Sequence, residues 1–534
     1  MHETMERDTN GVVHINGKDP AATFYGLGYA HGMDRGLQLL MTRIAGEGRI
    51  CECLHDSDEM LTVDMFFKRI NLKANMERQL EEIEPEIKVL LDAYCDGVNA
   101  ALRRKTPWEL KLLGYRPEPW TFEDIILMVR MTGYVSLEQA QGEMERLFVE
   151  MVQAGVSEDR LHALFPGILG GMDTGLIKDI TLTQRIVNPA TLWQTHVAPM
   201  ISSNNWAISG ERTASGSPIL ASDPHLEVNR LPSVWYEAVL KTPDSYIMGA
   251  TMPGLPAVLI GRNPDVAWGI TYAFVDAVDM WIERCENGHY YREPNTWRSF
   301  STRTETIHRK KNPSETVLFH ENPHGVLDGD PFTPGYYLSS AWAGADSGAV
   351  SLNNFLIMHS ARTVRQGMDL VKHVEVGLNF VLADKTGNIG YKMSGLMPKR
   401  KEGVSGLVPL PGWEAENDWN GFVDPDELPS EYNPECGYIV TANQDLNSKG
   451  RADPINICQG RYRAKRITEL LEPSNTLTPE DMFPIQNDVL SLQARSFMEI
   501  LSPLLPDTYQ GRILRDWDFR YDLESKGAWL FERF

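Results

Sequence analysis

Hydrophobic residues recur at helical spacing through the first 165 residues of the chain. Three segments carry this pattern, at residues 21–50, 77–104 and 121–152. A proline interrupts the second segment near its start, and Thr121 opens the third with Glu123 and Asp124 in its first turn. The pattern predicts a largely helical N-terminal region over residues 1–165.

The pattern changes after residue 165. Residues 166–202 are rich in Gly, Thr and Pro and have no sustained period, which indicates a linker or an exposed spacer. From Ser203 onward, short β-rich runs alternate with turn residues, and a polar β region continues to about residue 435. Helical spacing returns at residues 461–472 and 479–504. This order predicts an α+β protein.

The final residues, 525–534, read as the opening of an amphipathic helix that stops abruptly. We therefore expect the C-terminus of the 203–534 region to be truncated. The N-terminus lacks the apolar stretch of a signal peptide. The sequence has no run of 18 apolar residues, so no membrane span is expected. Either the protein is cytoplasmic or the natural start lies upstream of Met1.

Composition narrows the possible partners. The 534 residues include 51 basic and 73 acidic side chains, a net charge of -22 that repels phosphate backbones and argues against nucleic acid. The 6 cysteines lack zinc-site spacing, so they are isolated thiols or form at most one or two disulfides. The redox compartment stays open.

Residues 201–210, ISSNNWAISG, place adjacent hydroxyls and amides directly before a predicted strand. On its own this cluster is most simply a polar turn. A serine needs an adjacent base to act as a nucleophile, and no Gly-x-Ser-x-Gly elbow is present. A serine at a newly made N-terminus has another base, its own α-amine, whose pKa of about 7.7–8.0 suits proton transfer near neutrality. That solution requires the chain to be cut before the serine.

Ordered motifs along the chain support this second interpretation. They are Gly11–Ile15, Gly28–Arg35, Ser203–Ala207, Asp223–Leu226, Gly254–Pro256, Asn263, Ala267–Thr271, Asp276, Asp279, Trp413, Asn433–Pro434, Gly437–Ile439, Thr441–Asn443 and Arg463–Ile467. Together they resemble the penicillin acylase family of N-terminal-nucleophile hydrolases from about residue 8 to the end. The resemblance implies a four-layer αββα sandwich and a precursor that matures into an α/β heterodimer.

The resemblance also assigns catalytic roles. Ser203 would be the nucleophile and its freed amine the base. The Asn443 side chain and the Tyr272 backbone N–H would stabilise the charged carbonyl oxygen. His225 would orient the amine, and Arg466 would support the asparagine and the substrate carboxylate region.

A structural calcium ion is implied as well. Asp276, Asp279 and the carbonyl of Val278 resemble the family's ligands, with Asp453 and Glu143 as candidates to complete the shell. Calcium prefers six to eight oxygen ligands, so carboxylates from distant segments are suitable. The ion would tie the helical region to the catalytic region.

Three functions remain open from the sequence. The first is a penicillin acylase-type amidohydrolase acting on small N-acyl amides such as β-lactam side chains, in the periplasm or secreted as the resemblance implies. The second is an acylase for N-acyl homoserine lactones or lipopeptides, whose acyl pocket would use residues 131–134, 257–261 and the strand around Tyr272. The third is an inactive or truncated binding homologue. Ser202 stands where the family commonly has glycine, which predicts slower self-cleavage.

Overall fold

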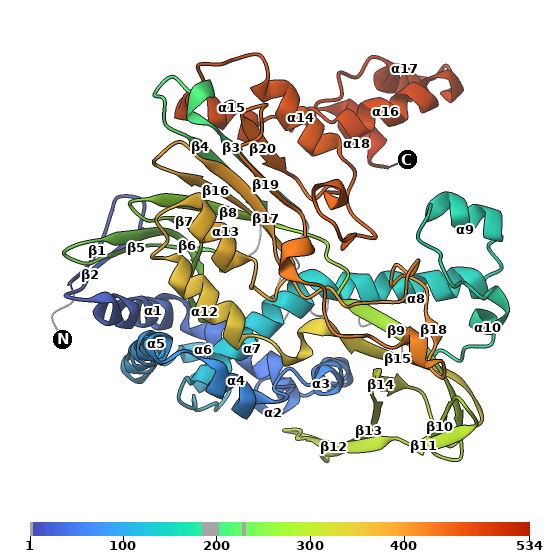
Figure 1. Ribbon diagram of the computed structural model, residues 1–534. Helices are drawn as coiled ribbons and strands as arrows, with labels where there is room; N and C mark the ends of the chain where they lie inside the picture. Colours follow the sequence, from blue (N-terminus) through green and yellow to red (C-terminus); the bar gives the residue numbers. More distant parts are fainter. Residues whose placement is uncertain (1–3, 184–201, 227–230, 534) are drawn as a thin grey trace.

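A computed structural model describes residues 4–183, 202–226 and 231–533 (Figure 1). It combines helices with three β-sheets, so the predicted α+β class is confirmed. Among the described residues, no helix has both the length and the apolar composition needed to cross a bilayer. All six cysteines have free thiols.

Two sheets form the centre of the molecule. The nine-stranded sheet contains, in spatial order, β1 (Thr4–Arg7), β2 (Val13–Asn16), β5 (Tyr236–Lys241), β6 (Tyr246–Met252), β7 (Leu255–Arg262), β8 (Val266–Tyr272), β16 (Leu378–Asp384), β17 (Ile389–Met393) and β19 (Ser430–Tyr432). The three-stranded sheet contains β20 (Tyr438–Thr441), β3 (Ser202–Ile208) and β4 (Ile219–His225). Both pairs in the smaller sheet are antiparallel.

An eight-stranded sheet extends to one side of this centre (Figure 1). Its strands are β9 (Val278–Glu286), β10 (His289–Arg292), β11 (Thr296–Ser299), β12 (Ser301–Ile307), β13 (Glu315–Asn322), β14 (Gly325–Asp328), β15 (Gly335–Trp342) and β18 (Leu410–Pro411). A short connector, residues 273–277, leads from β8 in the nine-stranded sheet to β9 in this one.

The helices agree with the predicted segments near both ends of the chain, but two of them, at residues 349–358 and 364–371, lie within the region predicted as β. They are α1 (Pro20–Gly46), α2 (Ile50–Cys53), α3 (Asp58–Ile70), α4 (Met76–Glu82), α5 (Pro85–Arg104), α6 (Trp108–Leu112), α7 (Phe122–Gly133), the π-helical turn η1 (Tyr134–Glu138), α8 (Gln139–Gln153), α9 (Glu158–Leu164), α10 (Thr174–Lys178), α12 (Ala349–Met358), α13 (Val364–Val371), α14 (Tyr462–Leu471), α15 (Met482–Gln486), α16 (Leu492–Leu501), α17 (Tyr509–Arg515) and α18 (Lys526–Phe531). The proline in the second predicted segment, Pro85, begins a new helix because it lacks the N–H that a helix interior requires. Thr121 caps α7 as predicted, in a capping box with Asp124.

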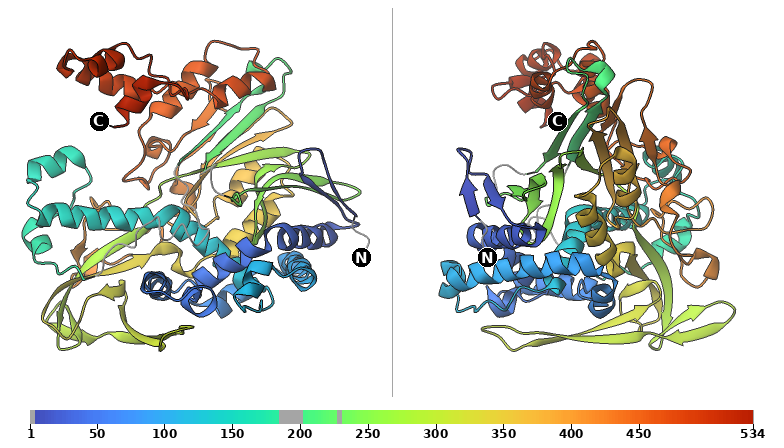
Figure 2. Two further views of the ribbon diagram at one scale, coloured as in Figure 1. Left: turned by 180° about the vertical axis from the view of Figure 1, so that it is seen from behind. Right: turned by 60° about the vertical axis from the view of Figure 1, so that its left-hand side comes forward.

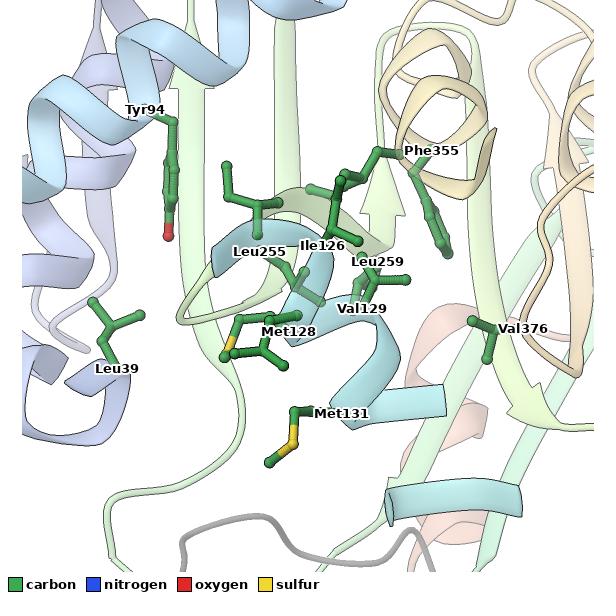
Figure 3. Packing of buried hydrophobic residues seen from close by; sticks show 14 of the residues in the cluster. Leu39, Tyr94, Ile126, Met128, Val129, Met131, Leu255, Leu259, Phe355 and Val376 are labelled. Atoms are coloured by element: carbon green, nitrogen blue, oxygen red, sulfur yellow. The ribbon is translucent and has the colours of Figure 1, made fainter. Parts of the chain in front are cut away.

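The two central sheets pack face to face with helices on both outer sides (Figures 1 and 2). Trp206 and Ile208 of β3 turn outward against Ile467 and Leu471 of α14. On the far face of the nine-stranded sheet, residues of β7 such as Leu255 and Leu259 pack with α7 and α12 (Figure 3). The predicted αββα sandwich is therefore confirmed.

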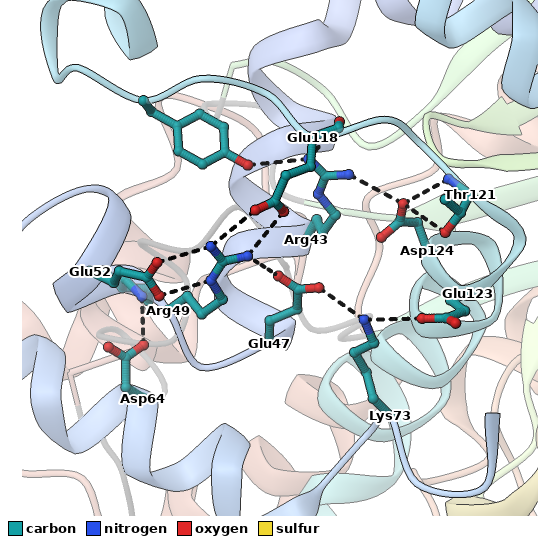
Figure 4. A network of polar contacts seen from close by, with 12 residues as sticks. Arg43, Glu47, Arg49, Glu52, Asp64, Lys73, Glu118, Thr121, Glu123 and Asp124 are labelled. Carbon is teal, nitrogen blue, oxygen red and sulfur yellow. Dashed lines mark hydrogen bonds and ion pairs between the residues drawn. The ribbon is translucent and has the colours of Figure 1, made fainter. Parts of the chain in front are cut away.

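Polar contacts join the first helices around this core. Arg43 of α1 is 2% exposed and donates to Asp124, the partner of Thr121 in the capping box of α7, at 3.2 Å (Figure 4). Arg49 pairs with Glu52 and Glu118 nearer the surface (Figure 4). The buried pair fixes how α7 sits on α1, whereas exposed pairs contribute little to stability.

Two of the predicted regions contain structure that the sequence did not predict. The helical region 1–165 also supplies β1 and β2, and β2 pairs in parallel with β5 of the catalytic region. Residues 166–183 are not exposed throughout, because Ile177 and Ile180 are buried against the eight-stranded sheet and α8. The role of this segment as a linker or spacer stays a prediction. Residues 184–201 lie outside the described residues, and Ser202 already belongs to β3.

Candidate active site

Ser203 occupies the centre of the sandwich, near the beginning of β3. Its side chain is 5% exposed and faces the end of β8. The Tyr272 backbone N–H donates to Ser203 Oγ at 3.3 Å, and Asn443 Nδ2 donates to the same oxygen at 3.3 Å. The structure thus brings two N–H donors, from β8 and from the segment after β20, to the hydroxyl of one buried serine.

Asn443 also contacts the backbone nitrogen of Ser203. That nitrogen donates to Asn443 Oδ1 at 2.7 Å, while Asn443 Nδ2 donates to the Tyr272 carbonyl at 2.8 Å. Asn443 has a φ of 64° and is 1% exposed. Asparagine tolerates this left-handed backbone better than most residues, so the turn after β20 can direct its amide at the serine.

His225 lies beside Ser203 rather than against its hydroxyl. It pairs with Ser202 across β3 and β4, and its Nδ1 is 2.8 Å from Ser202 Oγ. Its Nε2 is 3.1 Å from Asn204 Nδ2 and 3.1 Å from Asp223 Oδ2. Because successive strand residues point to opposite faces, these contacts lie across the strand from the Ser203 side chain. The predicted role in orienting the amine stays a prediction.

An arginine of α14 binds Asn443, but it is Arg463 rather than the predicted Arg466. It donates to Asn443 Oδ1 at 2.9 Å, to the Ser203 carbonyl at 2.8 Å and to Asn204 Oδ1 at 2.7 Å. Burial lowers the pKa of Arg463 to about 10, so the guanidinium keeps its charge near neutrality. The prediction for Arg466 is wrong, because that side chain lies one turn further along the helix and binds Asp488 at 2.6 Å.

Three buried carboxylates gather at the connector between β8 and β9. Glu145 of α8 joins Asp276 and Asp279, with one oxygen of each within 4.8 Å of the others. Arg400 donates to both oxygens of Asp279, and its guanidinium is 3.3 Å from Asp276 Oδ2. Burial raises the pKa of Asp276 to about 8 and also raises that of Glu145.

The oxygens of this cluster suit a hard cation. Both carboxylate oxygens of Glu145 and Oδ1 of Asp276 are buried, and no described side chain donates a hydrogen bond to them; the Met280 backbone N–H lies against Glu145. Buried carboxylate oxygens without a side-chain donor are ligands that calcium prefers. Arg400 already balances part of the negative charge, so the residues present fit a cation bound mainly on the Glu145 side.

Two predicted ligands lie elsewhere. Glu143 accepts a hydrogen bond from Gln139 and lines a separate cavity of about 950 Å³ between α3, α8 and the eight-stranded sheet. Two helix positions rotate a side chain by roughly 200°, which turns Glu143 away when Glu145 faces the cluster. Asp453 is exposed, although the next residue, Pro454, accepts a hydrogen bond from the Asp276 N–H at 2.8 Å. Val278 lies between the two aspartates at the start of β9, and its carbonyl stays a predicted ligand.

Comparison with known proteins agrees with this geometry. A family model described as penicillin amidase matches residues 4–534. The chain belongs to the penicillin amidase family. Acyl-homoserine lactone acylase QuiP of Pseudomonas aeruginosa is 31% identical over 88% of this chain. The matched part covers 58% of the length of that relative.

Other members of the penicillin amidase family are similar over most of the chain. Penicillin acylase 2 proenzyme of Pseudomonas sp. (strain SE83) is 29% identical over 99% of the chain and 70% of its own length. Penicillin G acylase of Escherichia coli is 24% identical over 93% of the chain and 66% of its own length. The solved structure of a thermostable penicillin G acylase from Alcaligenes faecalis aligns at 23% identity and a TM-score of 0.51, covering 60% of this chain and 59% of that one, which supports the shared fold.

Arg463 offers a direct test of the site in this penicillin amidase family member. We expect Arg463→Lys to lower kcat for amide hydrolysis by roughly 10- to 100-fold, the scale of losing a charge-assisted hydrogen bond. A lysine keeps the charge but cannot reach Ser203 O, Asn204 and Asn443 together. Arg466→Lys on the same helix is the matched control and should stay within about threefold of the original. Steady-state kinetics of the two purified variants measure both values of kcat. A lower kcat for Arg466→Lys than for Arg463→Lys would contradict the assignment of Arg463 as the arginine that supports Asn443.

Proposed function

We propose that the protein is an amide hydrolase that cuts its own chain before Ser203 and then cleaves N-acyl amides through an acyl-enzyme. The observation that carries this proposal is the convergence of the Tyr272 N–H and Asn443 Nδ2 on Ser203 Oγ. Asn443 Oδ1 accepts from the Ser203 nitrogen, the atom that becomes the base after the cut. The family membership supports the same reaction.

The catalytic cycle follows from these contacts. The freed Ser203 amine, with a pKa of about 7.7–8.0, takes the hydroxyl proton while Oγ bonds to the amide carbon of the substrate. The negative charge on the carbonyl oxygen then lies between the Tyr272 N–H and Asn443 Nδ2. Collapse breaks the C–N bond, the amine returns the proton to the leaving nitrogen, and water hydrolyses the remaining ester.

The two regions of the chain would stay together as an α/β heterodimer after the cut. The part before the cut provides β1 and β2 to the nine-stranded sheet, and β2 pairs with β5 from the part after the cut. Helices α1, α5 and α7 bury their apolar faces against the same core. Separation would expose this core to water, so the contacts favour a stable complex of the two chains.

The proposed substrates are β-lactam side-chain amides and related N-acyl compounds. A small apolar cavity of about 30 Å³ is lined by Thr132, Leu137, Leu259 and Ile270, and all three predicted acyl-pocket segments contribute to it. An apolar lining favours aromatic or aliphatic acyl groups over charged ones. Relatives named acyl-homoserine lactone acylase support the alternative of acyl-homoserine lactones.

A hydrolysis panel tests this proposal. Phenylacetyl, glutaryl and C6–C12 acyl amides of one leaving amine would be compared, with mass spectrometry of the same protein sample. We expect two chains, the second beginning at Ser203, and release of amine from an apolar substrate. An intact chain that hydrolyses no member of the panel would instead favour a binding homologue.

We further propose that the Glu145, Asp276 and Asp279 cluster binds a structural calcium ion. The ion would bind the buried Glu145 oxygens, to which no described side chain donates, and link α8 to the start of β9. Added calcium at about 100 times its dissociation constant should then raise Tm by roughly 3 °C. Thermal unfolding with calcium and with chelator measures this shift.

Two variants of α8 provide the matched comparison for calcium. Glu145→Gln should abolish the calcium-dependent rise in Tm, because an amide is a weaker ligand than a carboxylate. Glu143→Gln should retain the rise, since that side chain lies outside the cluster. The reverse result would place the ion with Glu143 and contradict the proposal.

A further inference from the structure

The connector between β8 and β9 has a strained backbone next to the proposed oxyanion donor. Phe274 has a φ of 56°, in the left-handed region that aromatic residues rarely adopt. Its ring packs against that of Tyr272, with ring centroids 4.3 Å apart. Such a conformation persists only where the surrounding structure holds it.

One face of the helical segment η1 and α8 lies along this connector. Gln141 Nε2 donates to the Val275 carbonyl at 2.6 Å, and the Ala277 N–H donates to Gln141 Oε1 at 3.0 Å. A single glutamine thus binds the backbone on both sides of Asp276. Both bonds are buried, where a hydrogen bond is costly to lose.

Glu138, the last residue of the π-helical turn, reaches the same connector from the other end. Its carboxylate, 2% exposed, accepts from the Trp342 indole N–H and from the Gly377 backbone N–H. The Gly377 carbonyl in turn accepts from the Ala273 N–H at 3.1 Å. Ala273 directly follows Tyr272, so Glu138 is linked to the proposed oxyanion donor through two intervening residues, Gly377 and Ala273.

Regular helical spacing places these side chains on one face, directly after a π-helical turn that ends at Glu138. A π turn adds one residue to a helix and rotates the residues after it, and such turns frequently occur at functional sites. Glu138, Gln141 and Glu145 are then three, four and seven positions apart, which places them on one side of the helix. They face, in order, the Ala273 side of the connector, its middle, and the aspartates at its end.

We propose that Glu138 and Gln141 are positioning residues that hold the strained Tyr272–Phe274 turn and thereby fix the Tyr272 N–H that binds the oxyanion. This inference rests on the proposed function, because the oxyanion exists only if Ser203 attacks an amide. Neither residue contacts Ser203 in the described part of the chain. Their effect passes through the backbone of the connector.

The charge state of Glu138 gives a second signature. Tyr134 on its own segment, Tyr272 on β8 and Asp276 on the connector are the titratable groups that face it. Burial raises the pKa of Glu138 from 4.5 to about 7, while the bonds from Trp342 and Gly377 lower it. Ionisation of Glu138 therefore destabilises the folded protein. The free energy of unfolding falls as pH rises from 4.5 through 7.

Three variants test the proposal. Glu138→Ala removes both hydrogen bonds and should lower kcat by about tenfold or more with KM within about twofold, since small displacements of a catalytic donor affect the chemical step. Glu138→Gln keeps one acceptor oxygen, enough for one of the two N–H groups, and should therefore lower kcat less than Glu138→Ala does. Glu150→Gln, an exposed position on α8, is the matched control. Tm of Glu138→Gln should fall less than that of the original protein between pH 4.5 and 7.

Hydrogen–deuterium exchange separates this inference from the proposed function. Peptides covering residues 272–277 should exchange faster in Glu138→Ala and Gln141→Ala than in Glu150→Gln, whether or not the protein hydrolyses amides. Unchanged exchange in both alanine variants would overturn the positioning role. If exchange accelerates but the original protein cleaves no amide and remains one chain, the proposed function is wrong. The role of Glu138 and Gln141 in holding the connector is then still supported.

Discussion

Replacing Ser203 with alanine is expected to leave the protein as a single polypeptide of 60.3 kDa without measurable amide hydrolysis. The variant loses the oxygen that attacks the preceding carbonyl, so the chain is not cut and the α-amine base is never formed. Loss of a serine nucleophile lowers kcat by roughly 10⁶-fold in other hydrolases. Mass spectrometry of intact protein and an assay of released amine measure the two effects separately.

Ser202 provides the control for this experiment. Ser202→Gly retains the Ser203 hydroxyl and has a more permissive backbone at the bond to be cut, so it should be cleaved at the same place and faster. If Ser203→Ala were still cut between residues 202 and 203, another nucleophile or an external protease would be responsible. Self-cleavage by Ser203 would then be wrong.

The layered architecture was largely predictable from local patterns. Short β-rich runs between turn residues give β3, β7 and β8, and 3.6-residue periodicity gives α1, α5 and α7. The pairing order was not predictable in this way, because β2 joins β5 across more than two hundred residues of chain. Local patterns contain no information about which distant strands exchange hydrogen bonds.

The linker shows how composition misleads. Gly, Thr and Pro between residues 166 and 183 predicted an exposed segment, yet Ile177 and Ile180 are buried. Both isoleucines stand in a sequence without helical or strand period. Their burial depends on α8 and the eight-stranded sheet, which only the folded chain brings near.

Site residues on strands and turns were easier to locate than those on helices. Ser203, Tyr272 and Asn443 stand where the motifs placed them, within hydrogen-bond distance of one another. On α14 the motifs identified the correct helix but the wrong side chain, Arg466 for Arg463. On α8 it is Glu145, not the predicted Glu143, that lies beside Asp276 and Asp279.

The physical reason lies in helix geometry. A shift of two or three positions on a helix changes both the direction and the height of a side chain, so a match to the segment does not fix the residue. The π-helical turn before α8 adds a further rotation that propensity cannot reveal. Glu145 looks like any other helical carboxylate in the sequence, and only its burial in the folded chain makes it conspicuous.

Asn443→Ala is expected to lower kcat by about 10²–10³ with a small change in KM, because it removes one of two oxyanion donors. The same change deletes the acceptor for the Ser203 nitrogen and one partner of Arg463, so self-cleavage should also slow. Alanine at a φ of 64° adds a stability penalty of about 1–2 kcal/mol. That penalty must be separated from the loss of chemistry.

Asn433→Ala is the control that separates the stability penalty from the loss of catalysis. Asn433 also has a left-handed backbone, with a φ of 47°, and its side chain accepts from the Ile389 N–H at 2.9 Å, but it is exposed and contacts no described part of the Ser203 site. Both variants should lower Tm for the same conformational reason, and only Asn443→Ala should lose catalysis in burst-phase kinetics of the matured protein. Equal kcat in the two variants would remove Asn443 from the oxyanion site and leave the Tyr272 N–H as the donor that the described geometry supports.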